Sequence, residues 1–214
     1  MTEIALPPRR VLATRETAWA QRLARMLGEA GATPNVVSVA GVVWSLAACA
    51  AFFVAGSLEG TSRAIVLLAA AASIQLRLLC NLLDGMLAIE QGLKSPLGDL
   101  YNEIPDRLAD IAILVGAGLA VNPALGCAAA IAALLTAYVR VLGGSLGLTQ
   151  HFTGPMAKQH RMFVITVATL WSAVEAVAGV PARGLALGLV VVTVGAVATI
   201  WRRVVLIANE LRAP

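Results

Sequence analysis

Six long apolar segments follow one another along the chain, and each is close to the roughly 20 residues that cross a bilayer as a helix. Short polar connections separate them, such as QGLKSPLGD and TQHFTGPMAKQH. Unbroken apolar runs of this length favour helices over the alternating strands of a membrane barrel. The pattern therefore predicts an all-α integral membrane protein with six transmembrane helices at about 35–57, 64–90, 100–121, 124–148, 161–180 and 184–207.

A shorter helical segment, 14–30, precedes these six. Its apolar residues recur at helical spacing and would form one face of a helix: Trp19, Leu23, Met26, Leu27 and Ala30. The remaining surface carries Arg15, Arg22, Arg25 and Glu29. Because so many charges exclude a span, the segment is expected to be an amphipathic helix lying along the cytoplasmic interface. Residues 1–32 form the predicted N-terminal arm and interfacial helix, and 33–214 the six-helix domain. The opening MTEIALPPRR lacks the apolar stretch of a cleaved signal, so the first span is expected to direct insertion.

Composition strengthens the membrane assignment. Hydrophobic residues make up 59% of the chain and charged residues 13%, where a soluble domain carries about 25% charged residues. The mean hydropathy is +0.83. The net charge of +4 does not indicate a nucleic-acid partner, because the basic residues cluster at the ends of apolar runs and form no stripe interleaved with aromatics.

The basic residues also orient the helices. Of 16 Lys and Arg, eleven fall on one side of the predicted membrane: Arg9, Arg10, Arg15, Arg22, Arg25, Lys94, Lys158, Arg161, Arg202, Arg203 and Arg212. Arg63 and Arg183 fall on the other side, and three lie within spans. By the positive-inside rule both termini are predicted to be cytoplasmic, in an inner or plasma membrane. An even number of spans agrees with this arrangement.

Acidic residues are concentrated in one window. Six of the twelve Asp and Glu lie between Asp84 and Asp110, across the end of the second span and the start of the third. Helical spacing places Arg77, Asn81, Asp84 and Ala88 on one face of 64–90, and Asn102, Asp106 and Asp110 on one face of 100–121. Two adjacent antiparallel helices would bring these faces together at the cytoplasmic end.

Charge inside the hydrocarbon is costly, so these side chains should be paired, hydrated or metal-bound. Their hard oxygen atoms suit Mg²⁺ or Mn²⁺ better than zinc. The alternative for the same residues is a structural ion-pair network that joins Arg77 and Arg107 to the acids.

The run NLLDGMLAIEQGLKSPLGDLYNEIPDRLAD, from Asn81 to Asp110, resembles the CDP-alcohol phosphotransferase family. The family motif is Asp-x2-Asp-Gly-x2-Ala-Arg-x8-Gly-x3-Asp-x3-Asp. Five positions match it: Asp84, Gly85, Ala88, Gly98 and Asp106. Three depart from it, with Asn81 at the first Asp, Ile89 at the Arg and Asn102 at the third Asp. In addition, Thr33-Pro34-Asn35 resembles the Thr-Pro-Asn that opens the first span in this family.

The resemblance implies an enzyme, a CDP-alcohol phosphatidyltransferase of phospholipid synthesis, with 33–214 as its catalytic domain. Such enzymes transfer a substituted phosphate from a CDP-linked donor, commonly CDP-diacylglycerol, to an alcohol acceptor and release CMP. By carry-over, Asp84 binds a divalent metal and Asp106 is both a metal ligand and the base that deprotonates the acceptor. Asn35, Gly85, Ala88 and Gly98 are implied to contact substrate, the glycines because they let the nucleotide approach closely.

The two asparagines supply oxygen atoms without the negative charge of the family's aspartates. One or two ions of Mg²⁺ or Mn²⁺ are expected, and the second ion is predicted to be weak or absent. Glu103 and Asp110 are the carboxylates that would compensate. A second register aligns Asp106-Arg-Leu-Ala-Asp110 with the end of the motif, and Asp106 belongs to the site in both registers.

Basic and polar residues complete the expected site. Arg77 is expected to contact substrate, and phosphate groups of donor or acceptor are expected to be bound by Arg140, Lys158 and Arg161. For Lys158 and Arg161 the alternative is ordinary membrane topology. The further partners considered are membrane lipid and a second copy of the chain. The competing functions are a catalytically weakened relative that binds nucleotide or lipid, a small proton-coupled transporter and a purely structural membrane protein.

Overall fold

The computed structural model describes residues 17–90, 98–181 and 183–212. The predicted arm at 1–14 and Lys94 in the 91–97 connection lie outside these residues. Within them the chain is helical: α1 (Ala18–Glu29), α2 (Pro34–Ala55), α3 (Gly60–Glu90), α4 (Gly98–Leu119), α5 (Pro123–Ser145), α6 (Lys158–Val177) and α7 (Arg183–Arg212). The predicted all-α class is confirmed, and each of the six apolar segments coincides with one of the helices α2 to α7.

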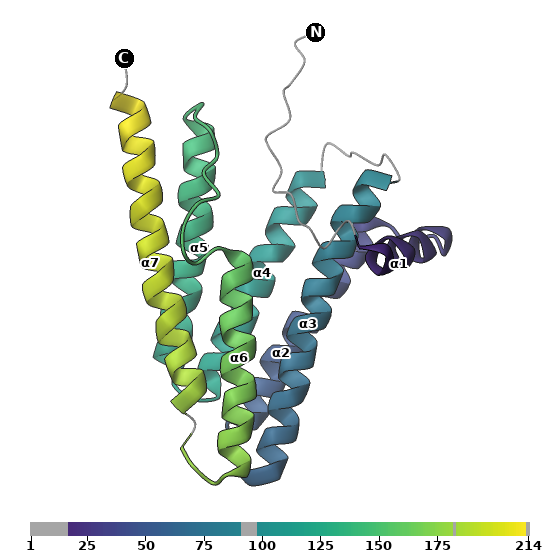
Figure 1. Cartoon of the computed structure of the whole chain (residues 1–214), viewed down its shortest axis with the longest axis vertical. Helices are drawn as coiled ribbons and strands as arrows, with labels where there is room; N and C mark the ends of the chain where they lie inside the picture. The colour runs from purple at the N-terminus through teal and green to yellow at the C-terminus, as the bar shows by residue number, and fades with distance from the viewer. Residues whose placement is uncertain (1–16, 91–97, 182, 213–214) are drawn as a thin grey trace.

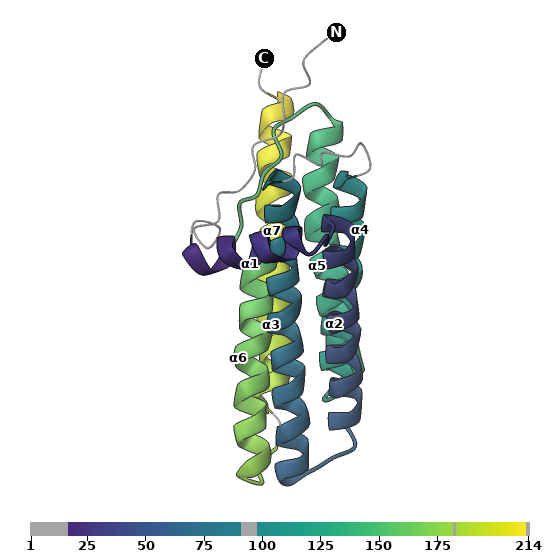
Figure 2. The same ribbon diagram turned by 90° about the vertical axis from the view of Figure 1, so that its right-hand side faces the viewer.

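The long helices form a closed ring. In the described residues α2 packs on α3, α3 on α6, α6 on α7, α7 on α5, α5 on α4, and α4 on α2 (Figures 1 and 2). Buried apolar side chains fill the bundle, among them Phe52, Leu67, Ile113 and Leu189. Small residues bring the helices close: a Cβ added to Gly116 of α4 would lie 2.6 Å from the Cα of Cys49 in α2.

Four of these helices are long and apolar enough to cross a membrane, counted over the described residues: α2, α3, α5 and α7. Large apolar side chains such as Phe53 and Trp201 point outward, where a bilayer would cover them. The other two helices of the ring, α4 and α6, carry charged residues of the polar site, which lowers their hydropathy. Their membrane crossing, and hence the count of six spans, stays a prediction.

Helix α1 lies across the bundle rather than along it (Figures 1 and 2). Its small residues Ala20 and Ala24 are buried against Leu83 and Leu87 of α3. Trp19, on the predicted apolar face, is 53% exposed on the outer side. The amphipathic helix is therefore present, and its location at the membrane interface stays a prediction.

Local signals explain where helices begin. Thr33 caps α2, its side-chain oxygen accepting a hydrogen bond from Val36 N at 3.4 Å, and Pro34 follows at the first helical position. At the far end of the bundle, the buried Glu175 carboxylate accepts from Gly184 N at 3.0 Å. A carboxylate favours the positive end of a helix, so this isolated acid serves the start of α7.

Candidate functional site

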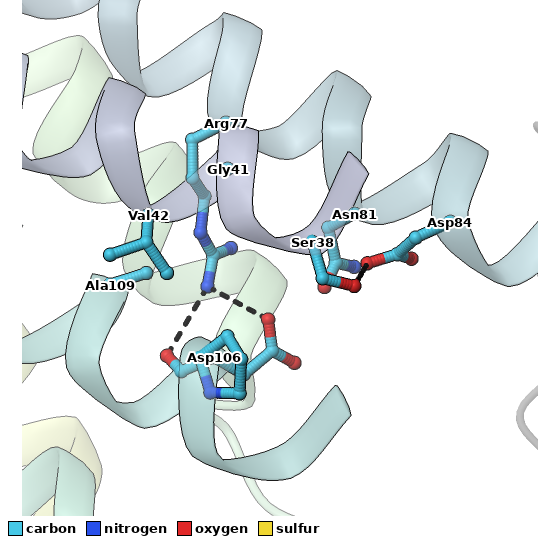
Figure 3. A pocket seen from close by; sticks show the side chains of 9 residues that line it. Ser38, Gly41, Val42, Arg77, Asn81, Asp84, Asp106 and Ala109 are labelled. Carbon is cyan, nitrogen blue, oxygen red and sulfur yellow. Dashed lines mark hydrogen bonds and ion pairs between the residues drawn. The ribbon is translucent and has the colours of Figure 1, made fainter. Parts of the chain in front are cut away.

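A polar pocket lies where α2, α3 and α4 come together near the end of the bundle that also holds α1 (Figures 1 and 3). It is lined by Ser38, Gly41 and Val42 of α2, by Arg77, Asn81 and Asp84 of α3, and by Pro105, Asp106 and Ala109 of α4. The two helix faces expected from the sequence do meet here. Helices α3 and α4 each pack mainly against α2. The residues of the two faces therefore meet through their side chains, without close packing of α3 on α4.

Arg77 connects α3 to α4. Its guanidinium donates to Asp110 Oδ1 at 2.8 Å and to Asp106 Oδ1 at 3.3 Å, and its exposed fraction is 1%. Figure 3 shows the bonds from Arg77 to the side chain and backbone of Asp106. From α6, Arg161 donates to Asp110 Oδ2 at 2.8 Å. Asp110 is therefore held by two buried guanidinium groups, and it does not line the pocket.

Lys158, the first residue of α6, contacts two of the residues that line the pocket. Its ammonium donates to Asn81 Oδ1 at 2.6 Å and also bonds Asp106 Oδ2. Burial, followed by the nearby Arg77 guanidinium, lowers the pKa of Lys158 to about 8, although Asp106 and Asp110 oppose this shift. Lys158 is therefore mainly an ammonium at neutral pH. Both carboxylate oxygens of Asp106 thus face a cation, Arg77 on one side and Lys158 on the other.

Asp84 differs from its two neighbours. Its Oδ2 accepts a hydrogen bond from the Ser38 hydroxyl at 2.7 Å (Figure 3). The residue is only 8% exposed, and no Lys or Arg of the described residues forms an ion pair with it. A buried carboxylate without a counter-charge is unfavourable unless a cation binds it. Asp84 is consequently a described carboxylate that a bound cation would stabilise.

A second group of charges lies on α4 and α5. Glu103 accepts from Arg140 at 2.6 Å and from Arg107 at 3.0 Å. Arg140 also donates to Gln150 at 3.0 Å and lies over the Phe152 ring, 5.0 Å from its centroid. The predicted phosphate-binding Arg140 is therefore preorganised by neighbours and linked to α4 through Glu103.

The structural ion-pair network weighed as an alternative is present. Arg77 and Arg107 pair with Asp106, Asp110 and Glu103. Glu103 and Asp110, the candidates to replace missing metal ligands, are both held by arginines. Within the described residues no group of three His, Cys, Asp or Glu side chains is arranged to hold a metal ion.

The charges of the described side chains suit one divalent ion but not two. One divalent ion fits beside Asp84, whose buried charge has no described counter-ion. Two ions do not fit, because Asp106 and Asp110 are already neutralised by Arg77, Lys158 and Arg161.

The remaining predicted residues occupy simpler positions. Asn35 is exposed at the start of α2, and Gly85 and Ala88 are half-buried on α3. Gly98 begins α4, and Asn102 follows in the same helix with its side chain outside the described part of the structure. Their contacts with substrate stay predictions.

Ser38 is a site residue that the sequence reasoning missed. It lies on α2 with Gly41 and Ser45 at helical spacing, a face of small residues within an otherwise apolar span. This face of small residues was the signal in the sequence that could have indicated Ser38. Its partner Asp84 is 46 positions away, however, and the spacing within α2 does not reveal which helix it meets.

Comparison with known proteins establishes the fold. No protein-family model and no curated protein matches the chain. The structure is similar to that of the Mycobacterium tuberculosis phosphatidylinositol phosphate synthase PgsA1 with CDP-DAG bound, with a TM-score of 0.74 and 22% identity over 89% of this chain and 94% of that one. A second structure of that enzyme, in complex with manganese and citrate, gives a TM-score of 0.72 and 22% identity over 88% of each chain.

At this identity the likeness establishes a shared fold. The motif between Asn81 and Asp110, which resembles the CDP-alcohol phosphotransferase family, lies in a chain that shares this fold.

Proposed function

We propose that this protein transfers a substituted phosphate from a CDP-linked lipid, CDP-diacylglycerol in the first instance, to an alcohol acceptor and releases CMP. The observation that carries the proposal is the meeting of Asp84 and Asp106 in one pocket of a fold shared with a CDP-DAG-binding synthase. The motif residues between Asn81 and Asp106 support it independently, because their spacing matches the family pattern.

In this reaction an oxygen of the acceptor hydroxyl bonds to the phosphorus that carries the diacylglycerol. The bond from that phosphorus to the oxygen of CMP breaks, and the hydroxyl proton moves to a carboxylate. Asp106 is the proposed proton acceptor because its side chain is 18% exposed and lines the pocket, whereas that of Asp110 is 4% exposed. Lys158 and Arg77 orient the Asp106 carboxylate.

Asp84 is proposed to hold one ion of Mg²⁺ or Mn²⁺, with Ser38 fixing the orientation of its carboxylate. Such an ion supplies positive charge against the pyrophosphate of the donor as CMP leaves. Arg140, Arg161 and Lys158 are proposed to bind phosphate groups. Arg140 is the best placed of the three, since Arg161 is 2% exposed and its terminal nitrogens bond Asp110, Thr136 and Met156.

A catalytically weakened relative is the second candidate function. The observation that favours it is the state of Asp106, whose two oxygens are both held by cations, together with an amide at position 81. Such a protein would bind the donor without releasing CMP.

The decisive experiment measures CMP release by the purified protein in nanodiscs containing CDP-diacylglycerol, with Mg²⁺ or Mn²⁺ and a panel of alcohol acceptors. We expect release that a chelator abolishes, and loss of at least about a hundredfold in Asp84→Asn and in Asp106→Asn. Glu29→Gln, an exposed acid on α1, is the matched control and should keep full activity. Binding of the donor without CMP release from any acceptor would favour the weakened relative.

A further inference from the structure

We propose that the Lys158 ammonium is a built-in cation of this site, which holds the place between Asn81 and Asp106 that a second divalent ion would need. The pocket then takes a single divalent ion, at Asp84. This inference rests on the proposed function, since it treats the pocket as a metal-assisted site. Metal binding can nevertheless be measured without any transfer reaction.

The position of the ammonium carries the inference. Lys158 Nζ lies 2.6 Å from Asn81 Oδ1 and bonds Asp106 Oδ2, so one oxygen from α3 and one from α4 converge on it. Amide and carboxylate oxygens are the ligands that Mg²⁺ and Mn²⁺ take in proteins. The convergence of two such oxygens from different helices on one point is the arrangement of a cation site, and here a side chain supplies the cation.

The surrounding charges exclude a second divalent ion at that point. Two carboxylates, Asp106 and Asp110, face three cations, Arg77, Lys158 and Arg161. This half of the site already carries an excess of positive charge, and an added divalent ion would be repelled. Asp84 forms no ion pair with a described Lys or Arg, and Lys158 acts on it only through a longer-range Coulombic interaction, so the ion is attracted to that side of the pocket.

The residue at position 81 fits the same interpretation. The family motif has Asp there, and a carboxylate together with a divalent ion has a net charge of about +1. Asn81 together with the Lys158 ammonium has the same net charge. Exchanging the carboxylate and the metal for an amide and an ammonium therefore preserves the local charge while removing the need for the second ion.

The test counts bound Mn²⁺ by electron paramagnetic resonance of the free ion, with chelator-treated protein in phosphatidylcholine nanodiscs and empty nanodiscs as background. Wild type should bind one ion. Asp84→Asn should bind none, and Lys158→Arg, which keeps a cation, should still bind one. The double variant Lys158→Met with Asn81→Asp should bind two, the second at least about tenfold more tightly than any second ion in wild type.

Two comparable sites in wild type, or no site at all, would overturn the inference, and so would a folded double variant that binds no more than one ion. Size-exclusion profiles and melting curves identify variants that fail to fold. If the variants do not fold, the number of Mn²⁺ ions bound by wild type still decides the question. One bound Mn²⁺ without CMP release would leave the inference standing and reject the proposed function. Transfer with two bound ions would support the proposed function and reject the inference.

Discussion

Asp84 and Asp110 are buried aspartates of the same polar site, but their electrostatic surroundings differ. Asp110 accepts hydrogen bonds at 2.8 Å from both Arg77 and Arg161. Asp84 accepts from the Ser38 hydroxyl and forms no ion pair with a described Lys or Arg. A buried charge is stable only when its partners are present. Asp110 is therefore held in place by its ion pairs, whereas Asp84 is the carboxylate that a bound cation would stabilise.

This difference predicts opposite effects of the same substitution on stability. Asp110→Asn leaves the buried Arg161 guanidinium without a described counter-charge and removes one of the two carboxylates that pair with Arg77. We expect a loss of about 3 kcal/mol in the free energy of unfolding. Asp84→Asn removes a buried charge with no described counter-ion, so the metal-free protein should be at least as stable as wild type. Thermal unfolding in detergent, with chelator present, measures both. Equal destabilisation by the two substitutions would contradict the assignment.

Added Mn²⁺ provides the complementary measurement on the same proteins. A ligand that binds only the folded state raises its stability. Mn²⁺ should therefore raise the melting temperature of wild type and fail to raise that of Asp84→Asn.

At the scale of the helices, close packing holds the pocket together. Ser38 lies on α2 and Asp106 on α4, and these two helices approach closely where Gly116 faces Cys49. The polar end is thus braced by contacts deeper in the bundle. A change in the spacing of α2 and α4 would alter the distance between the Asp84–Ser38 pair and Asp106.

Gly116→Ala tests this contact. The new Cβ would lie 2.6 Å from the Cα of Cys49, which is backbone, so the helices must separate. Overpacking of this kind costs about 1–3 kcal/mol, and we expect a corresponding fall in melting temperature. Gly41→Ala is the matched control on α2, since its Cβ would lie 3.4 Å from Cys80 Cβ, an ordinary contact. If Gly116→Ala melted at the same temperature as the control, α2 and α4 could separate without a loss of stability, which would contradict the prediction.

At the scale of the whole molecule, the polar site lies toward one end of the bundle. Helix α1, the last turns of α7, the end of α3 and the start of α4 all lie toward that end (Figures 1 and 2). The turn between α2 and α3 lies at the opposite end. If the helices cross a membrane, the site therefore lies toward the side that holds α1 and the end of α7.

The distribution of basic residues predicts that this side is the cytoplasm. An enzymatic reporter fused after Pro214 should be active only in the cytoplasm. The same reporter fused after Ser57, in the turn between α2 and α3, should be active only on the other side. Activity of the Pro214 fusion outside the cytoplasm would overturn the predicted orientation.

The sequence by itself determined the helices and the acidic centre of the site. Predicted spans such as 35–57 and 100–121 agree within a few residues with α2 (Pro34–Ala55) and α4 (Gly98–Leu119), because a long apolar run forms a helix wherever it packs. The largest difference is at the end of α7, which continues to Arg212, beyond the predicted 207. Polar residues there end the apolar run without breaking the helix.

Only the tertiary structure decided which side chains partner the acids. Helical spacing defines faces within one helix, but the order of helices around the ring depends on how small residues and charges pack together. Lys158 is 77 positions from Asn81 and Ser38 is 46 from Asp84, and no local pattern links either pair. The same limit explains why Glu103 and Asp110 resembled free metal ligands in the sequence. Their arginine partners on α5 and α6 become neighbours only when the ring closes.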